Sequence, residues 1–150
     1  MPQSLAKIYV HLIFSTKGRE PILAADIRAK LHSYMGGILR DLDSPAMEIN
    51  SVADHLHILF MLSRTRALSD VVSQIKRGTS AWLKTQNKVY SKFHWQNGYG
   101  AFSVSQSAVD QVREYIRGQS EHHKKTTFQD EFRVFLRRYG VEFDEQYVWD

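Results

Sequence analysis

Residues 51–60, with the sequence SVADHLHILF, place two histidines on either side of one leucine inside an apolar run. A short apolar run that follows a polar turn predicts a buried β-strand. Because residues two apart in a strand project to the same side, His55 and His57 point together and Leu56 points to the opposite face. Two imidazoles on one face make half of a metal site. The alternative is that they only form hydrogen bonds beside the core, since histidine is often partly buried.

The stretches on both sides of this strand predict an ordered series of strands and helices. Apolar residues cluster or alternate in the extended segments and recur every three or four residues in the helical ones. In chain order we predict a strand within 7–19, a helix over 26–42, a hairpin of strands within 46–54 and 55–63, a helix over 68–83, a strand within 95–106, a helix from 107 to about 125 and a short helix over 128–139.

This order matches the split βαβ plan of a ferredoxin-like (RRM-like) domain. We therefore predict an α+β fold with a four-stranded antiparallel sheet, helices on one face of that sheet and further helices at the C-terminus. The length of 150 residues suits one domain with a substantial core, so we expect a single domain over residues 1–150. Because this fold serves many unrelated functions, function has to be inferred from particular residues.

The composition restricts the chemistry that this chain can perform. It contains no cysteine, so any metal must be held by histidine, carboxylate, amide or water ligands. No stretch approaches the roughly 18 apolar residues of a membrane helix, and the N-terminus lacks the pattern of a secretory signal peptide. We therefore expect a soluble, cytoplasmic protein without a membrane partner.

Positive charge gathers close to the two histidines in the sequence. The net charge is +4, and RTRALSDVVSQIKRG, residues 64–78, contains Arg64, Arg66, Lys76 and Arg77. A basic cluster of this kind favours a polyanion such as nucleic acid. A solvated helix face is the alternative explanation for the same charges.

The predicted helix that begins near residue 107 adds a tyrosine and an amide. Tyr115 and Gln119 are four residues apart, so they share one face of this helix at the border of its apolar stripe. A metal ion held by two histidines and an amide oxygen, with a phenol nearby, is a plausible arrangement for phosphoryl transfer. A boundary tyrosine with its hydroxyl in water is the common alternative. Gly118, between the two residues, could loosen the helix.

Several segments together resemble one protein family. They are HLIFSTKGREPIL (11–23), DHLHILF (54–60), LSDVVSQIKRGTS (68–80), WQNGYGAFSVS (95–105), YIRGQSEHH (115–123) and the ending FRVFLRRYGVEFDEQYVWD (132–150). In this order they are similar to the insertion-sequence-200-like transposases, which act on single-stranded DNA and belong to the single-tyrosine HUH endonucleases. The resemblance extends over nearly the whole chain.

The resemblance implies a role for each candidate residue. His55 and His57 would bind Mg²⁺ or Mn²⁺, with Gln119 as third ligand. Tyr115 would attack the scissile phosphate, leaving a 5′-phosphotyrosine link and a free 3′-hydroxyl. The substrate would be single-stranded DNA with hairpin ends, contacted by Lys76, Arg77, Arg64 and Arg66. The family also implies a prokaryotic, nucleoid-associated homodimer in which each active site receives the tyrosine helix of the other subunit.

Two other functions are compatible with the same sequence. One is a domesticated relative that processes repetitive extragenic hairpins instead of moving its own element. The other is a non-catalytic nucleic-acid-binding module of ferredoxin-like fold, although HLHILFML, residues 55–62, offers only Phe60 for base stacking. We expect His122 and His123 to be exposed to solvent and to take no part in catalysis.

Overall fold

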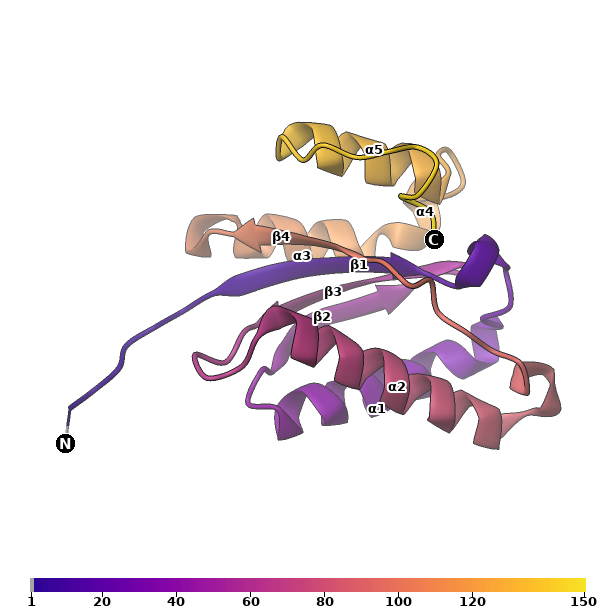
Figure 1. Cartoon of the computed structure of the whole chain (residues 1–150), viewed down its shortest axis with the longest axis horizontal. Coiled ribbons are helices and arrows are strands. Elements are labelled where there is room, and N and C mark those ends of the chain that lie inside the picture. The colour runs from indigo at the N-terminus through magenta and orange to yellow at the C-terminus, as the bar shows by residue number, and fades with distance from the viewer. Residues whose placement is uncertain (1) are drawn as a thin grey trace.

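The computed structural model describes residues 2–150 and contains one antiparallel sheet with the strand order β2-β3-β1-β4. The strands are β1 (Tyr9–Ser15), β2 (Ala46–Ser51), β3 (His55–Met61) and β4 (Gly100–Val104) (Figure 1). The two central strands, β1 and β3, pair over their full length, from Tyr9 opposite Met61 to Ser15 opposite His55. This is the predicted ferredoxin-like arrangement.

The lower face of the sheet packs on two long helices, α1 (Ala25–Asp41) and α2 (Leu68–Gln86), as Figure 1 shows. Alternate strand residues project to this face because side chains in a strand alternate between its two sides. These residues and the apolar stripes of both helices form the largest core cluster, which includes Leu12, Phe14, Leu56, Ile58, Phe60, Leu31, Met35 and Ile75. The sequence pattern therefore predicted this half of the molecule correctly.

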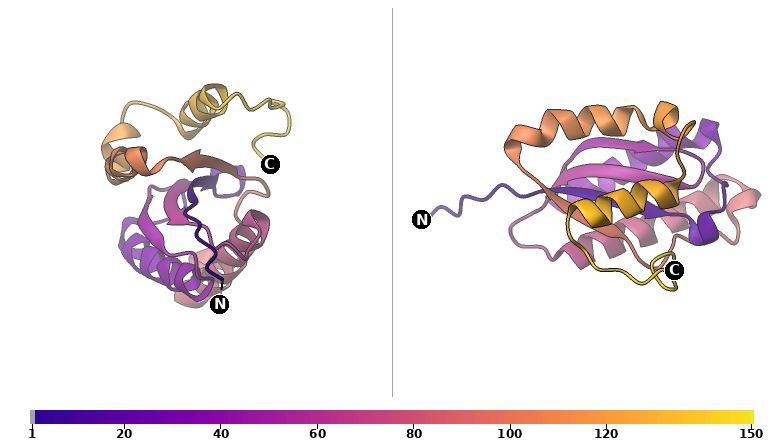
Figure 2. Two further views of the ribbon diagram at one scale, coloured as in Figure 1. Left: turned by 90° about the vertical axis from the view of Figure 1, so that its left-hand side faces the viewer. Right: turned by 90° about the horizontal axis from the view of Figure 1, so that it is seen from above.

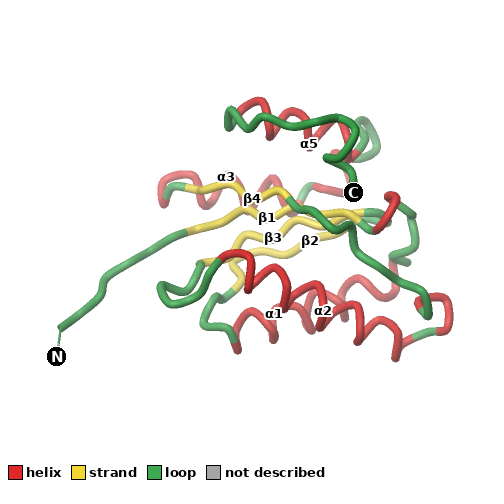
Figure 3. The backbone as a smooth tube through the Cα atoms, viewed as in Figure 1, coloured by secondary structure: helices red, strands yellow, loops and turns green. Residues whose placement is uncertain are grey.

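The upper face is covered by the C-terminal third of the chain. The helices α3 (Val109–Arg117), α4 (Gln119–His122) and α5 (Phe128–Arg138) lie on the opposite side of the sheet from α1 and α2, so the sheet is the middle layer (Figures 2 and 3). Phe102 and Ile13 of the strands pack against Phe132 and Phe135 of α5. A module that stacks bases on its sheet needs this face open, so the arrangement argues against such a function.

The predicted helix from 107 to about 125 is interrupted, which corrects that expectation. It begins with a 3-10 turn, Gln106–Ala108, continues as α3 and ends at Gly118, after which α4 forms one further turn. Asn50 of β2 stabilises this end, because its Nδ2 donates to the carbonyl oxygens of Ile116 at 2.8 Å and Arg117 at 3.2 Å. These are carbonyls that a helix terminus leaves without an intrahelical partner.

None of the helices formed by residues 2–150 has the length and apolar character needed to cross a membrane.

Candidate metal and nucleophile site

The strand register gathers three histidines on the upper face of the sheet. His55 and His57 are both buried, and their side chains project to this face as the sequence spacing predicts. Strand β1 adds His11, which lies next to the pair because Ile13 is opposite His57. The His11 Nε2 is 2.8 Å from the Nδ1 of His57. The sequence interpretation missed His11. Strand alternation places it on the same face of β1 as Ile13, two residues further along.

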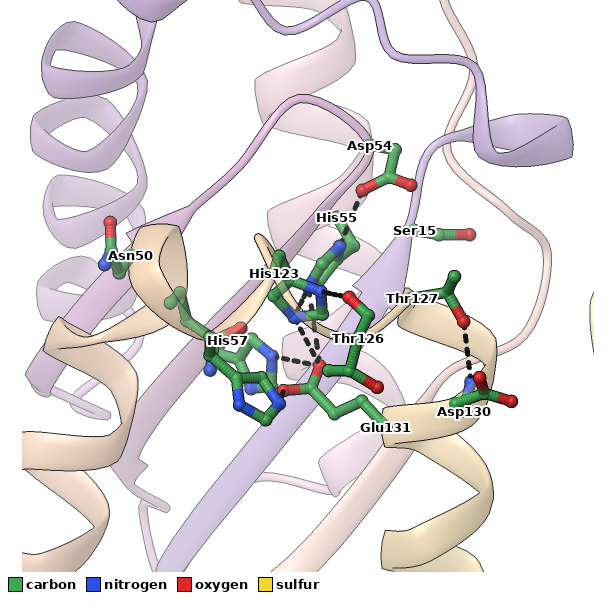
Figure 4. A network of polar contacts seen from close by, with 12 residues as sticks. Ser15, Asn50, Asp54, His55, His57, His123, Thr126, Thr127, Asp130 and Glu131 are labelled. Atoms are coloured by element: carbon green, nitrogen blue, oxygen red, sulfur yellow. Dashed lines mark hydrogen bonds and ion pairs between the residues drawn. The ribbon is translucent and has the colours of Figure 1, made fainter.

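The C-terminal segment adds a fourth histidine and a carboxylate to this cluster. His123 follows α4, and Glu131 lies in the first turn of α5. Glu131 Oε1 is 2.9 Å from His57 Nε2, 3.1 Å from His123 Nε2 and 3.4 Å from His55 Nε2. One ligand atom from each of these four residues lies within 4.8 Å of every other, and Figure 4 shows the side chains converging.

The expectation that His122 and His123 are exposed to solvent is wrong for His123. Its side chain is only 10% exposed, and its Nε2 lies 3.0 Å from that of His55. His122 is partly exposed, with its Nε2 3.2 Å from Glu131 Oε2. A sequence signal for Glu131 exists in hindsight, since it is an acid on the apolar face of α5, one residue before the buried Phe132.

Tyr115 lies beside the histidine cluster of its own chain. Its hydroxyl donates a hydrogen bond to Glu131 Oε2, the carboxylate oxygen that does not face His57. The phenol ring packs edge-on against His57 and Phe135, with ring centroids 5.8 Å and 5.7 Å away. The tyrosine and the predicted metal ligands are therefore brought together through one carboxylate.

Gln119 is fully buried at the start of α4. Its Nε2 donates to the carbonyl oxygen of Tyr115 at 3.4 Å, while its Oε1 is the single buried side-chain polar atom in residues 2–150 without a hydrogen-bond partner. A buried amide oxygen without a partner costs free energy, and it is suited to receive a cation. The predicted third ligand thus has a free ligand atom on the helix that follows Tyr115.

The buried carboxylate governs the electrostatics of the cluster. Burial opposes its charge, but hydrogen bonds from His123, His55 and His57 hold the pKa of Glu131 far below its usual value. Burial opposes a charge on His55 too, yet its bonds to Asp54 and Glu131 raise the pKa of this histidine. Burial and the nearby Glu131 charge raise the pKa of Tyr115, so its phenol is protonated in the free protein.

The four cations predicted to contact DNA lie in two separate regions of the surface. Lys76 and Arg77 line a groove of about 670 Å³ between α2 and the segment 94–99, together with Lys84 and Tyr99. The Lys76 ammonium is hydrogen-bonded within the chain, because its Nζ donates to the carbonyl oxygens of Gln96, Asn97 and Gly98 at 2.7–3.2 Å. Arg77 is exposed.

Arg64 and Arg66 lie apart from that groove. Both are exposed on the loop that follows Met61, whereas His55 begins the same strand at its other end. The structure therefore does not bring the two arginines next to the histidine cluster.

Comparison with known proteins identifies the family of this chain. A family model described as "Transposase IS200 like" matches residues 4–119. The ISDra2 transposase TnpA of Deinococcus radiodurans is 23% identical over 120 residues, which cover 77% of this chain and 84% of that protein.

Two solved structures share the fold. One, described as a transposase of Deinococcus radiodurans R1, has a TM-score of 0.60 and 20% identity over 79% of this chain and 98% of its own. The other, a REP-associated tyrosine transposase bound to a REP hairpin, has a TM-score of 0.61 and 14% identity over 82% and 73%. Because the family model matches more than two thirds of its residues, this chain belongs to the IS200-like transposase family.

Proposed function

We propose that this protein cleaves and rejoins single-stranded DNA at the ends of an insertion element, with Tyr115 as the nucleophile and a divalent metal ion at His55 and His57. One observation carries the proposal. The Tyr115 hydroxyl and the Nε2 atoms of both histidines converge on the two oxygens of a single buried carboxylate, that of Glu131.

The donor atoms present fit a divalent ion. The Nε2 atoms of His55 and His57 both face Glu131 Oε1, and the partnerless Oε1 of Gln119 is the proposed further ligand, as the sequence resemblance implies. Imidazole is a softer ligand than Mg²⁺ prefers, so Mn²⁺ competes well for such a site. When bound, the ion would polarise the scissile phosphate.

In the proposed reaction the Tyr115 oxygen loses its proton and forms a bond to phosphorus while the bond from phosphorus to the 3′-oxygen breaks, and the released 3′-oxygen takes up a proton. The products are a 5′-phosphotyrosine and a free 3′-hydroxyl, and attack by another 3′-hydroxyl reverses the step and joins new strands. The hydrogen bond to Glu131 fixes the direction of the phenol, so less orientation has to be gained when DNA binds.

The groove along α2 is the proposed path for the DNA backbone. Arg77 and Lys84 supply exposed charge, and Lys76 shapes the groove by holding the 96–98 turn. The same segment reaches the active end of the sheet, because Gln96 N donates to the carbonyl oxygen of Ser15, which is paired with His55. The structural relative bound to a REP hairpin supports hairpin DNA as the ligand. Arg64 and Arg66 remain proposed contacts for a more distant part of the strand.

We propose that the protein is a homodimer in which Tyr115 acts at the metal site of its own chain. Arg117 and Arg113 of α3 contact Glu48 of β2 at 2.9 and 3.4 Å, and Asn50 holds the end of α3. These contacts support an active site built within one chain, in contrast to the expected exchange of tyrosine helices between subunits.

A covalent adduct tests the proposed function. The protein is incubated with Mn²⁺ and single-stranded DNA bearing hairpin element ends, and the digested product is analysed by mass spectrometry. We expect a nucleotide on Tyr115 and none in Tyr115→Phe, whereas Tyr34→Phe, which alters an exposed tyrosine of α1, should react normally. A nucleotide on any other tyrosine would refute the assignment.

Processing of repetitive extragenic hairpins is the second candidate function. The fold shared with the REP-associated transposase favours it. The same adduct assay separates the two functions, because a domesticated enzyme would react with isolated repetitive hairpins in preference to paired element ends.

A further inference from the structure

Two residues of the histidine cluster lie outside residues 4–119, the part of the chain that the family model matches. The family match ends at residue 119, whereas His123 and Glu131 follow it. We propose that His123 and Glu131 are ligands of the same divalent ion as His55 and His57, so that the C-terminal segment adds an imidazole and a carboxylate to the metal site. This inference deepens the proposed function and rests on it.

The separations between the donor atoms match those around a bound metal ion. Ligand bonds of about 2.0–2.2 Å place neighbouring ligand atoms roughly 3.0 Å apart at right angles and about 3.4 Å apart in a tetrahedron. The observed distances from Glu131 Oε1 to the Nε2 atoms of His57, His123 and His55 are 2.9, 3.1 and 3.4 Å. The His55 and His123 Nε2 atoms are 3.0 Å apart. Four of the six separations among these donors thus have metal-ligand spacing, and every pair lies within 4.8 Å.

Each imidazole is also held through its other ring nitrogen. Metal-binding histidines usually have such a partner, which fixes the ring and directs the remaining nitrogen to the ion. Asp54 Oδ1 lies 2.7 Å from His55 Nδ1, and His11 Nε2 lies 2.8 Å from His57 Nδ1. The carbonyl oxygen of Thr126 lies 2.8 Å from His123 Nδ1. His123 is therefore oriented in the same manner as the two histidines expected to bind metal.

Glu131 occupies a position where an uncompensated charge would be costly. It is 3% exposed and lies on α5 between Phe128 and Phe132, which are both buried. A buried carboxylate needs a cation or several hydrogen-bond donors. Its two oxygens face different groups, since Oε1 meets the imidazoles of the cluster, whereas Oε2 meets the Tyr115 hydroxyl and the partly exposed His122. As a ligand through Oε1, Glu131 would also fix the tyrosine relative to the ion.

Mn²⁺ binding tests the inference independently of catalysis. Calorimetric titration of Mn²⁺ is compared for the wild type, His123→Ala, Glu131→Gln and two controls, Glu121→Gln and His94→Ala, which alter exposed residues. Because loss of even an indirect partner weakens metal binding about 10- to 100-fold, each test variant should bind Mn²⁺ at least about tenfold more weakly. The controls should match the wild type.

Pulsed electron paramagnetic resonance then counts the imidazole nitrogens on Mn²⁺. Three are expected in the wild type and two in His123→Ala. Two in the wild type, or wild-type affinity in Glu131→Gln, would overturn the inference even if His123→Ala failed to fold. If both test variants bind Mn²⁺ normally while the wild type forms the Tyr115 adduct, only the extra ligands are refuted. If all four residues bind Mn²⁺ but no adduct forms, the proposed function fails and the ligand set stands.

Discussion

The two faces of the same sheet use their buried positions differently. On the lower face, strands β1 and β3 contribute only apolar side chains to the core beneath them, among them Leu12, Phe14 and Ile58. On the upper face, the same strands contribute His11, His55 and His57, all buried. The lower side of these strands is therefore entirely apolar, whereas on the upper side packing residues such as Ile13 are interleaved with the histidines of the candidate site.

The two faces differ in the free energy of burying their side chains. An apolar side chain gains stability on burial, whereas a buried imidazole or carboxylate costs free energy unless it has a partner. Each upper-face histidine has partners, and they come from β1, α5 and the segment after α4. The lower face should therefore determine whether the chain folds, and the upper face whether it reacts.

Replacing both strand histidines should have the largest effect. In His55→Ala/His57→Ala the ion loses two ligands, so we expect cleavage with Mn²⁺ to fall by a factor of about 1,000 or more, since metal stabilisation of the transition state is worth several kcal/mol. Cleavage is measured under single-turnover conditions, and circular dichroism checks the fold. Cleavage of the double variant at the wild-type rate would refute the metal assignment.

A core substitution on the lower face should show the opposite pattern. Leu12→Ala leaves a cavity in the fully buried core, so the free energy of unfolding should fall by about 2–5 kcal/mol, as measured by urea denaturation. The remaining folded protein should cleave DNA at the wild-type rate. A large loss of activity per folded molecule would show that the two faces are not independent.

The lower face was also the half that the sequence predicted best. Its apolar spacing over 26–42 and 68–83 produced helices within a few residues of those observed, because amphipathic periodicity reports burial directly. The sequence also placed His55 and His57 together, since strand alternation alone determines it.

The rest of the site depends on contacts that local patterns do not encode. His11 contacts His57 through strand pairing, although the two residues are 46 positions apart in the sequence. Glu131 contacts His57 across 74 positions. His123 was expected in solvent, but contacts with His55 of β3 and Glu131 of α5 bury most of its side chain. The helix ends at Gly118, the residue that the sequence singled out as able to loosen it, but the contact of this end with Asn50 of β2 is long-range and was not predicted.

Replacing either of two adjacent cations of α2, Lys76 or Arg77, should have an effect of intermediate size. Lys76→Met should lower the free energy of unfolding by about 1–3 kcal/mol, because three carbonyl oxygens of the 96–98 turn lose their donor. Arg77→Met should leave stability nearly unchanged but weaken DNA binding, with a salt dependence reduced by about 0.7 in the log–log slope. Denaturation and fluorescence anisotropy at several salt concentrations measure the two effects. Equal losses of stability in both variants would contradict the different roles of these neighbours.

The smallest expected effect comes from Asn50, which joins the edge of the sheet to the tyrosine helix. Asn50 is paired with His57 in the strand register, and its amide donates to the carbonyl oxygen of Ile116, the residue after Tyr115. Asn50→Ala removes this bond and should lower the free energy of unfolding by about 1 kcal/mol. Because a small misplacement of a reacting group slows chemistry, the single-turnover rate should fall about tenfold.

Three measurements separate positioning by Asn50 from a general loss of structure. Mn²⁺ affinity and hairpin binding should match the wild type, since Asn50→Ala leaves the metal ligands and the α2 groove intact. Asn50→Asp keeps the acceptor that receives the backbone N–H of Ser51 but loses the donor, so its rate should fall at least as far. Glu48→Gln, on the same strand, is the control for the weaker outer contacts to Arg113 and Arg117 and should react at nearly the wild-type rate. A normal rate in Asn50→Ala would show that α3 is held in place by its packing alone, and a matching loss of Mn²⁺ binding would show a general loss of structure instead of a positioning role.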